Sequence, residues 1–314
     1  MSQVPPSIES VESSCAVADF DFEEIAQVRE KVYRGKLAED RIGDSRDVYI
    51  KVHDEKRKDR LEEFAQHASD VGHPPVHLID GEHLCLLMGT AEGRPLSRLL
   101  PVVTVPGIWR LYNERMEEAY HEIGRQIGTL HEKTRSETGP LLSDEQITTA
   151  LERTELLTDR LESDLVERTR RLFEEARDQQ TCHALTYGDR SPHNIYWNGD
   201  RVTHIDATCK RRSVVADHAS ALMGVRLMIE RLPYARKRVR QRLEEAYWEG
   251  YAETGIESSM NSELCAVRYV KRSLALLSYY DSKPRSLNTK LTRRIDPPIV
   301  IREIRQTVSE LDHL

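Results

Sequence analysis

The chain has 314 residues, which is enough for about two domains or for one large domain of two lobes. With 39% hydrophobic and 32% charged residues, it is a globular sequence with a heavily charged surface. No apolar run approaches the roughly 20 residues that span a bilayer, and the first residues lack the pattern of a secretory signal. The net charge of -7 disfavours a nucleic-acid partner. We therefore expect a protein without a transmembrane segment and without bound nucleic acid.

The five cysteines are spread along the chain and form no CxxC pair. An odd, scattered set is typical of reduced thiols, and not of a disulfide framework or a zinc site. We therefore expect a cytoplasmic location.

The first part of the chain predicts a small β-rich lobe. We expect residues 1–20 to form a frayed terminus and residues 21–88 to form the lobe itself. β-Branched and aromatic residues indicate the strands, and an apolar face indicates the helix. The predicted elements are strands at 32–34 and 47–52, a charged helix at 54–70, and a hairpin of 76–79 and 84–88.

The remainder, residues 89–314, predicts a large and mostly helical lobe, joined to the first by a hinge near 89–96. Apolar residues between Met116 and Leu130 follow a 3.6-residue period, which is typical of an amphipathic helix. The other predicted elements are helices at 144–178 and from 216 to the end, with one β segment at 193–206. The predicted fold class is therefore α+β, with two lobes.

The β segment of the large lobe and the loop before it carry the candidate chemistry. Asn194 follows Asp189 by five residues, and a strand, a turn and a second strand then return Asp206 beside this pair. In phosphoryl transfer, one carboxylate takes the proton of the attacking hydroxyl, while oxygen ligands hold Mg²⁺ against the nucleotide phosphates. The group of Asp189, Asn194 and Asp206 therefore suits phosphoryl transfer, with one carboxylate as the base and the other carboxylate, together with the amide oxygen, on Mg²⁺.

A kinase also needs a lysine on a small-lobe strand and a helix glutamate that holds this lysine. The strand segment Val48–Lys51 supplies Lys51 for the phosphates. Glu62 and Glu63 are the candidates on the next helix, and Glu62 is favoured because it lies nearer the apolar face. A solvated, charged helix face is the alternative explanation for both glutamates.

At these residues the sequence resembles the aminoglycoside phosphotransferase family of small-molecule kinases. The matching motifs come in family order and span about residues 25–220. The motifs are Glu30–Arg34, Val48–Lys51, Leu86–Gly93, Leu130-His131, Tyr187–Asn194, Ile205-Asp206 and Ala216-Asp217. Each motif alone is weak, but together they are specific.

The resemblance implies a bilobal protein-kinase-like fold that binds ATP and Mg²⁺, with Lys51 on the phosphates. It implies Asp189 as the catalytic base, and Asn194 and Asp206 as the magnesium ligands. It also implies that Tyr49 lies against the adenine and that backbone from Met88 to Ala91 bonds the edge of the ring. Asp217 is implied as the residue that ties the following helix to the catalytic loop. The implied activity is an ATP-dependent phosphotransferase, a kinase that moves the γ-phosphoryl group to a hydroxyl of a small molecule. We expect a sugar or an amino sugar as acceptor.

Three departures from the family pattern favour an alternative, a pseudokinase or nucleotide-binding regulator. Tyr187 stands where the family usually has histidine, and Ala207 stands where an aromatic residue or leucine is commoner. The segment Gln27–Lys31, between the first two strands, has no glycine, although Arg29 and Lys31 could cover phosphates by their side chains. Because the base and both metal ligands are retained, we expect an active kinase.

Two groups of basic residues favour a further alternative. One group runs from Arg231 to Arg242, and the other from Lys283 to Arg294. A solvated helix face is the ordinary explanation for such groups. An anion-binding patch would instead suit a kinase of a lipopolysaccharide core or another membrane-held glycan, in peripheral contact with an anionic surface.

Overall fold

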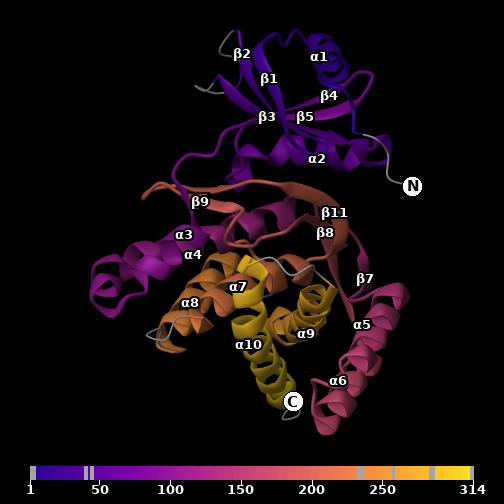
Figure 1. Ribbon diagram of the computed structural model, residues 1–314, viewed down its shortest axis with the longest axis vertical. Helices are drawn as coiled ribbons and strands as arrows, with labels where there is room; N and C mark the ends of the chain where they lie inside the picture. The colour runs from indigo at the N-terminus through magenta and orange to yellow at the C-terminus, as the bar shows by residue number, and fades with distance from the viewer. Residues whose placement is uncertain are drawn as a thin grey trace.

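The computed structural model describes residues 5–38, 42, 46–231, 237–256, 259–282 and 287–311. The chain forms two lobes, a β-rich N-terminal lobe and a larger helical lobe that contains the C-terminus (Figure 1). The fold class is α+β, as the sequence predicts. Among the described residues, no helix is both long and apolar enough to cross a membrane.

The small lobe is built on a five-stranded antiparallel sheet in the order β1-β2-β3-β5-β4. In β3, Val48 and Ile50 are buried, whereas Tyr49 and Lys51 are more exposed on the opposite face. This alternation turns Tyr49 and Lys51 toward the same side of the sheet. The strands are β1 (Phe22–Arg29), β2 (Val32–Leu37), β3 (Asp47–His53), β4 (Val76–Asp80) and β5 (Leu84–Gly89).

The segment before this sheet is ordered, so the prediction of a frayed terminus over 1–20 is wrong for residues 8–16. These residues form helix α1 (Ile8–Ala16), which packs against β1, β4 and β5. Val11 and Cys15 are fully buried there. Burial of this apolar face stabilises the helix, which nine residues in isolation would not sustain.

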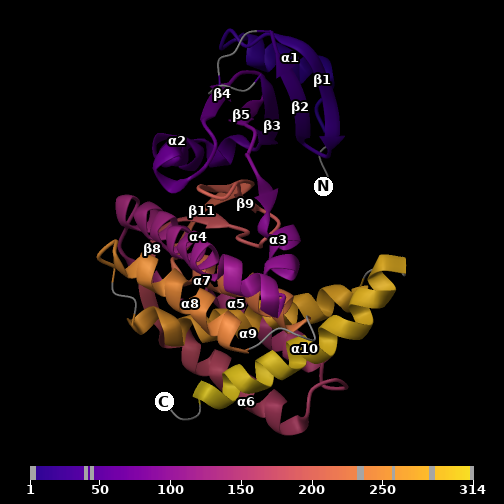
Figure 2. The same cartoon turned by 90° about the vertical axis from the view of Figure 1, so that its left-hand side faces the viewer.

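Helix α2 (Lys58–His67) forms where the charged helix is predicted, and it links the two lobes. Its buried residues Leu61 and Phe64 belong to an apolar cluster that also contains Leu185 and Tyr187 of the large lobe. Figure 2 shows α2 above β9 (Ile195–Trp197) and β11 (Ala207–Ser213), two strands at the top of the large lobe. The lobes therefore share a packed apolar contact behind the cleft.

The hinge leads from β5 into β6 (Arg94–Pro95), which pairs with β9 (Ile195–Trp197) of the large lobe. Gly93 precedes β6 at a φ of +89°. A Cβ at this position would lie 2.3 Å from the carbonyl oxygen of Trp197. Only glycine therefore allows this close crossing of the hinge over β9.

The large lobe holds two three-stranded sheets, in the orders β10-β9-β6 and β11-β8-β7. The single β segment predicted at 193–206 corresponds only to β9 and β10. The remaining strands escaped prediction because β8 has few β-branched residues and β11 is rich in charge. The further strands are β7 (Thr138–Pro140), β8 (Gln180–Gly188), β10 (Val202–His204) and β11 (Ala207–Ser213).

Helix α4 (Pro106–Lys133) contains the periodic segment of the sequence and packs mainly against α8 (Lys237–Ala252). At Gly124, a Cβ would lie 1.9 Å from the carbonyl oxygen of Tyr247, so α4 and α8 are in backbone contact. The helix predicted at 144–178 is two helices, interrupted between Leu157 and Glu162. The other helices are α3 (Leu96–Val103), α5 (Asp144–Leu156), α6 (Ser163–Glu175), α7 (Val215–Glu230), α8 (Lys237–Ala252), α9 (Ser259–Ser282) and α10 (Leu287–Leu311).

The basic groups named from the sequence are only partly described. Lys283, Arg285 and Arg236 lie outside the described residues, as do the side chains at 237, 290, 293 and 294. Arg240 is buried and bonds Glu303 at 3.1 Å, and Arg242 bonds Glu117 at 2.8 Å. These two arginines are therefore engaged in ion pairs between helices and do not form part of a free basic face.

Candidate active site

The loop after β8 places Asp189 and Asn194 next to each other. Gly188 ends the strand at a φ of +107°, and a Cβ here would lie 1.9 Å from the hydroxyl oxygen of Thr208. The side-chain amide of Asn194 donates to the carbonyl oxygen of Asp189 at 3.1 Å. The backbone N–H of Ile205 donates to the carbonyl oxygen of Asn194 at 2.9 Å. These bonds fold the loop back beside the segment that carries Asp206.

Asp217, in the first turn of α7, anchors this loop from behind. Its carboxylate accepts hydrogen bonds from the backbone N–H of Tyr187 at 2.7 Å and of Gly188 at 3.0 Å. Burial alone would raise the pKa of Asp217, but the contact with His131 and the charges of Arg190 and Arg212 hold it below its usual range. A buried charged carboxylate therefore ties α7 to the loop, in the manner that the family resemblance implies.

Tyr187 and Ala207 both lie behind the loop and not in the cleft. The Tyr187 side chain is buried, and its hydroxyl donates to the carbonyl oxygen of Val71 at 3.4 Å. The guanidinium of Arg190 stacks on the Tyr187 ring, 3.0 Å from its centroid. Ala207 is buried in the same apolar cluster. The two departures from the family pattern therefore change the packing that supports the loop, while the polar groups of the loop are retained.

Lys51 and Asp206 meet across the two lobes in an ion pair. Arg29, at the end of β1, also approaches the Asp206 carboxylate, at 3.4 Å. Burial alone would raise the pKa of Asp206, but these two cations bring it below the ordinary value. The turn between β1 and β2 consists of Glu30 and Lys31 only, which explains how Arg29 reaches the cleft without a glycine-rich loop.

The structure does not bring the two candidate glutamates of α2 to Lys51. Glu63 bonds the guanidinium of Arg211 through both carboxylate oxygens, each at 2.6 Å. Glu62 is exposed on the same helix. Among the described residues, the ion-pair partner of Lys51 is Asp206. The role of Glu62 remains a prediction, and Glu63 instead fastens α2 to β11.

A hollow of about 530 Å³ lies between the lobes and gathers five of the predicted residues. Its size falls within the range of small-molecule pockets. The predicted residues that line it are Tyr49, Lys51, Met88, Ala91 and Asp206. Val32 and Ile205, which belong to two of the matching motifs, also line it. So do His73 and Tyr196, which lie outside those motifs and reach the cleft only through the folded arrangement.

A second hollow, of about 460 Å³, adjoins the same loop on its other side. Ser191, Pro192 and His193 form one wall, and α7 and α9 form the others. From α9, Arg272 reaches the carboxylate of Asp189 at 2.9 Å. Sequence analysis missed Arg272 because 83 residues separate it from Asp189 and no local pattern links the two.

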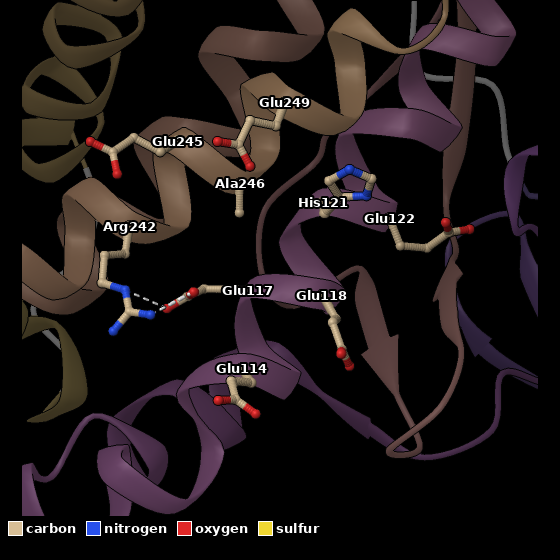
Figure 3. Close-up of a pocket in the computed structure, with 9 residues that line it drawn as sticks. All are labelled: Glu114, Glu117, Glu118, His121, Glu122, Arg242, Glu245, Ala246 and Glu249. Atoms are coloured by element: carbon tan, nitrogen blue, oxygen red, sulfur yellow. Dashed lines mark hydrogen bonds and ion pairs between the residues drawn. The ribbon is translucent and has the colours of Figure 1, made fainter.

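A third hollow, of about 530 Å³, lies between α4 and α8 (Figure 3). Carboxylates from both helices line it, and Arg242 bonds one of them, Glu117. It contains none of the residues predicted for phosphoryl transfer.

No model of a known protein family matches the sequence, and no curated protein sequence matches it. Solved structures do match. A glucosamine kinase in complex with glucosamine, ADP and inorganic phosphate matches with a TM-score of 0.59 and 10% identity, over 98% of this chain and 100% of that chain. An amicoumacin kinase in complex with AMP-PNP and Ca²⁺ matches with a TM-score of 0.56 and 14% identity, over 93% of this chain and 89% of that chain. A choline kinase from Cryptosporidium parvum Iowa II matches with a TM-score of 0.54 and 10% identity, over 94% of this chain and 91% of that chain.

These likenesses cover nearly the whole chain, and at such identities they show the fold. The predicted protein-kinase-like fold is thereby confirmed. The chain shares its bilobal α+β architecture with these glucosamine, amicoumacin and choline kinases, and Asp206 lines the hollow between its lobes.

Proposed function

We propose that the protein is an ATP-dependent kinase that phosphorylates a hydroxyl of a small molecule. The observation that carries this proposal is the meeting of Lys51 with Asp206 in the hollow between the lobes. Asp189 and Asn194 lie on the loop that adjoins this pair. A cation for the phosphates, a base and two oxygen ligands are the groups that phosphoryl transfer requires.

The hollow between the lobes is the proposed nucleotide site. Tyr49 and Ile205 line it from the small and large lobe, and they would hold the adenine between them. Backbone of the hinge from Met88 to Ala91 would bond the edge of the ring. Lys51 would pair with the phosphates, and Arg29 adds a second cation at the mouth.

The donor set at Asp206 fits a magnesium ion. The Asn194 side chain uses its N–H₂ group on the loop, which leaves the amide oxygen as a possible ligand. The Asp206 carboxylate is held charged beside two cations. Oxygen ligands of this kind, completed by phosphate oxygens, are what Mg²⁺ prefers. When bound, the ion would neutralise charge that develops on the phosphates.

In the proposed step, the acceptor hydroxyl oxygen forms a bond to the γ-phosphorus as the bond to the β,γ-bridging oxygen breaks. ADP leaves with that electron pair, and the hydroxyl proton passes to the Asp189 carboxylate. Asn194 holds the backbone of Asp189 in place through its side-chain amide. The exposed fraction of the Asp189 side chain is 50%, so an acceptor can approach it from solvent.

A regulator without catalysis is the second candidate, and Tyr187 and Ala207 are the residues that suggested it. Both residues lie in the apolar cluster behind the loop, away from the polar groups of the cleft. A pseudokinase would more simply have lost Asp189 or Asp206. A kinase of a membrane-held glycan gains no support from Arg240 and Arg242, because both are paired with glutamates.

A phosphotransfer screen tests the proposal. Purified protein with Mg²⁺ and ATP is offered sugars, sugar acids, amino sugars and amino alcohols, and ADP release is measured for each. We expect at least one acceptor to raise ADP release above a slow basal hydrolysis, and the Asp189→Asn variant to lose the increase. If no acceptor in a broad screen is phosphorylated while ATP still binds, the regulator is favoured instead.

A further inference from the structure

The second hollow is well placed to receive the acceptor. It borders Ser191, Pro192 and His193, which follow the proposed base, Asp189, on the same loop. Helix α7 packs closely on this loop, since a Cβ at Gly224 would lie 2.3 Å from Cδ of Pro192. The hollow also contains Arg272, whose guanidinium bonds Asp189. A molecule bound here would therefore lie against the residue that takes its proton.

Among the described residues that line this hollow, the charged side chains are both arginines, and one of them, Arg272, pairs with Asp189 on the adjoining loop. Arg231 and Arg272 line it, and the described residues of its wall include no carboxylate. Apart from Ser191, His193 and Ser220, most of the remaining wall is apolar or aromatic. The apolar and aromatic residues include Met223, Leu227, Met228, Leu276, Tyr279 and Tyr280. A hollow of this composition suits a compound that has an apolar or aromatic body and an anionic group.

The surroundings of the hollow carry further positive charge. Lys271, beside Arg272 on α9, has its pKa lowered to about 8, by burial first and then by the neighbouring charges of Arg268, Arg153, Arg212 and Arg272. Arg268 is itself lowered, to a pKa of about 9, by burial and by Arg212. This concentration of cations contrasts with the net charge of -7 of the whole chain. It would repel a protonated amine and attract a carboxylate or phosphate.

The contact between Arg272 and Asp189 places the positive charge of Arg272 next to the proposed base. Arginine has five N–H donors in a planar fork, so Arg272 can bond an acceptor anion while it stays near the base. A cationic acceptor would instead bring a second positive charge beside this guanidinium. The positive charge of Arg272, beside the proposed base, therefore favours an anionic acceptor over a cationic one.

We propose that the acceptor of this kinase is an anionic hydroxyl compound, bearing a carboxylate or phosphate group on an apolar or aromatic body, and that Arg272 and Arg231 determine this specificity. The inference rests on the proposed kinase function. It favours anionic acceptors over the positively charged amino sugars and amino alcohols.

Matched probes of one shape and different charge test this inference. Calorimetry measures binding of 1-naphthoate, 1-naphthyl phosphate and 1-naphthylmethylammonium, with saturating AMP-PNP and Mg²⁺ so that the nucleotide cleft is filled. We expect at least one anion to bind roughly tenfold or more tightly than the cation. The carboxylate and phosphate arms show which anion is preferred. Equal affinities, or tighter binding of the cation, would overturn the proposal.

Variants assign the preference to the two arginines. Arg272→Gln and Arg231→Gln should each reduce the ratio of anion to cation affinity by roughly tenfold. Arg177→Gln is the matched control, because Arg177 forms an exposed ion pair with Asp144 on another part of the lobe. An unchanged ratio in both hollow variants would also overturn the proposal.

The same preparation separates this inference from the kinase proposal. Binding of AMP-PNP is titrated first, and its absence counts against the kinase function alone, because the probes still report the charge preference.

As a second readout, glucuronate, glucose and glucosamine compare one ring with three charges. We expect kcat/KM to be highest for glucuronate and lowest for glucosamine. The reverse order would contradict the inference while supporting a kinase.

Discussion

Lys51 of β3 forms an ion pair with Asp206, which follows β10, although 155 residues separate them in the chain. One residue comes from each lobe, so the pair marks the point where the two lobes meet in the cleft. The backbone of Asp206 adopts a φ of 61°, a left-handed conformation that non-glycine residues seldom adopt. Strain of this kind persists where the surrounding structure enforces it, which is common at functional sites.

Replacing Lys51 by alanine should abolish most ATP use while the fold remains intact. The charge that pairs with Asp206 and would pair with the phosphates is lost, and we expect kcat/KM for ATP to fall about 100-fold or more. Steady-state kinetics and circular dichroism on the same sample measure both effects. Lys58→Ala is the matched control, since Lys58 pairs with Asp80 at the surface. Turnover near wild type from folded Lys51→Ala protein would contradict the assignment.

Replacing Asp189 by asparagine should separate binding from transfer. The amide cannot accept the hydroxyl proton, so phosphotransfer should fall about 100-fold or more, while affinity for ATP with Mg²⁺ stays the same. ADP release and calorimetry measure the two quantities. Asp200→Asn, in the exposed turn after β9, should change neither. Retained transfer in Asp189→Asn would remove Asp189 from the role of base.

Replacing Asp217 by alanine should destabilise the large lobe. Its carboxylate is fully buried and accepts the backbone N–H groups of Tyr187 and Gly188, which would lose their partner. Breaking a buried charged network of this kind costs about 3–5 kcal/mol of unfolding free energy. Urea unfolding of wild type and variant measures the difference, with the exposed Asp164→Ala as control. A loss below about 1 kcal/mol would show that the loop does not depend on this anchor.

Mild acid should weaken the fold through buried histidines. Burial lowers the pKa of His73 to about 4, below the ordinary value of about 6.5 in the unfolded chain. As the pH falls from about 6.5 to about 4, the unfolded chain binds a proton that folded His73 does not bind. The free energy of unfolding therefore falls over this window, by about 3 kcal/mol from His73.

Urea unfolding at pH 7 and at pH 4.5 to 5 follows this loss, and the His73→Gln variant should lose less stability between the two conditions. His53 has its pKa lowered to about 4 by burial as well, so part of the pH dependence should remain in the variant. The same dependence in wild type and His73→Gln would contradict the assignment to His73.

The sequence allows good prediction where the pattern is local. The alternation of residues in Val48–Lys51 predicts which side chains face the cleft. The short spacing from Asp189 to Asn194 predicts a tight loop, and in the structure the Asn194 side chain bonds the backbone of Asp189. The N-terminal helix escaped prediction because Val11 and Cys15 are a weak apolar pattern, and the helix is stabilised by packing on the sheet.

Contacts between distant segments could not be read from the sequence. Arg272 bonds Asp189 because α9 packs beside the loop after β8. Arg211 bonds Glu63 because β11 packs beside α2. Neither arginine lies in a motif. The partner of a charged side chain depends on the tertiary arrangement, and a spacing rule along the helix does not contain that information.

Calorimetric titration of ATP into wild-type protein, with and without Mg²⁺ and beside the Asp206→Ala variant, tests the kinase assignment most directly. We predict that wild type binds ATP more tightly with Mg²⁺ than without it, because Asn194 and Asp206 are the proposed oxygen ligands of the ion. We predict that Asp206→Ala loses this dependence on Mg²⁺. If wild type binds no ATP under either condition, the assignment is wrong.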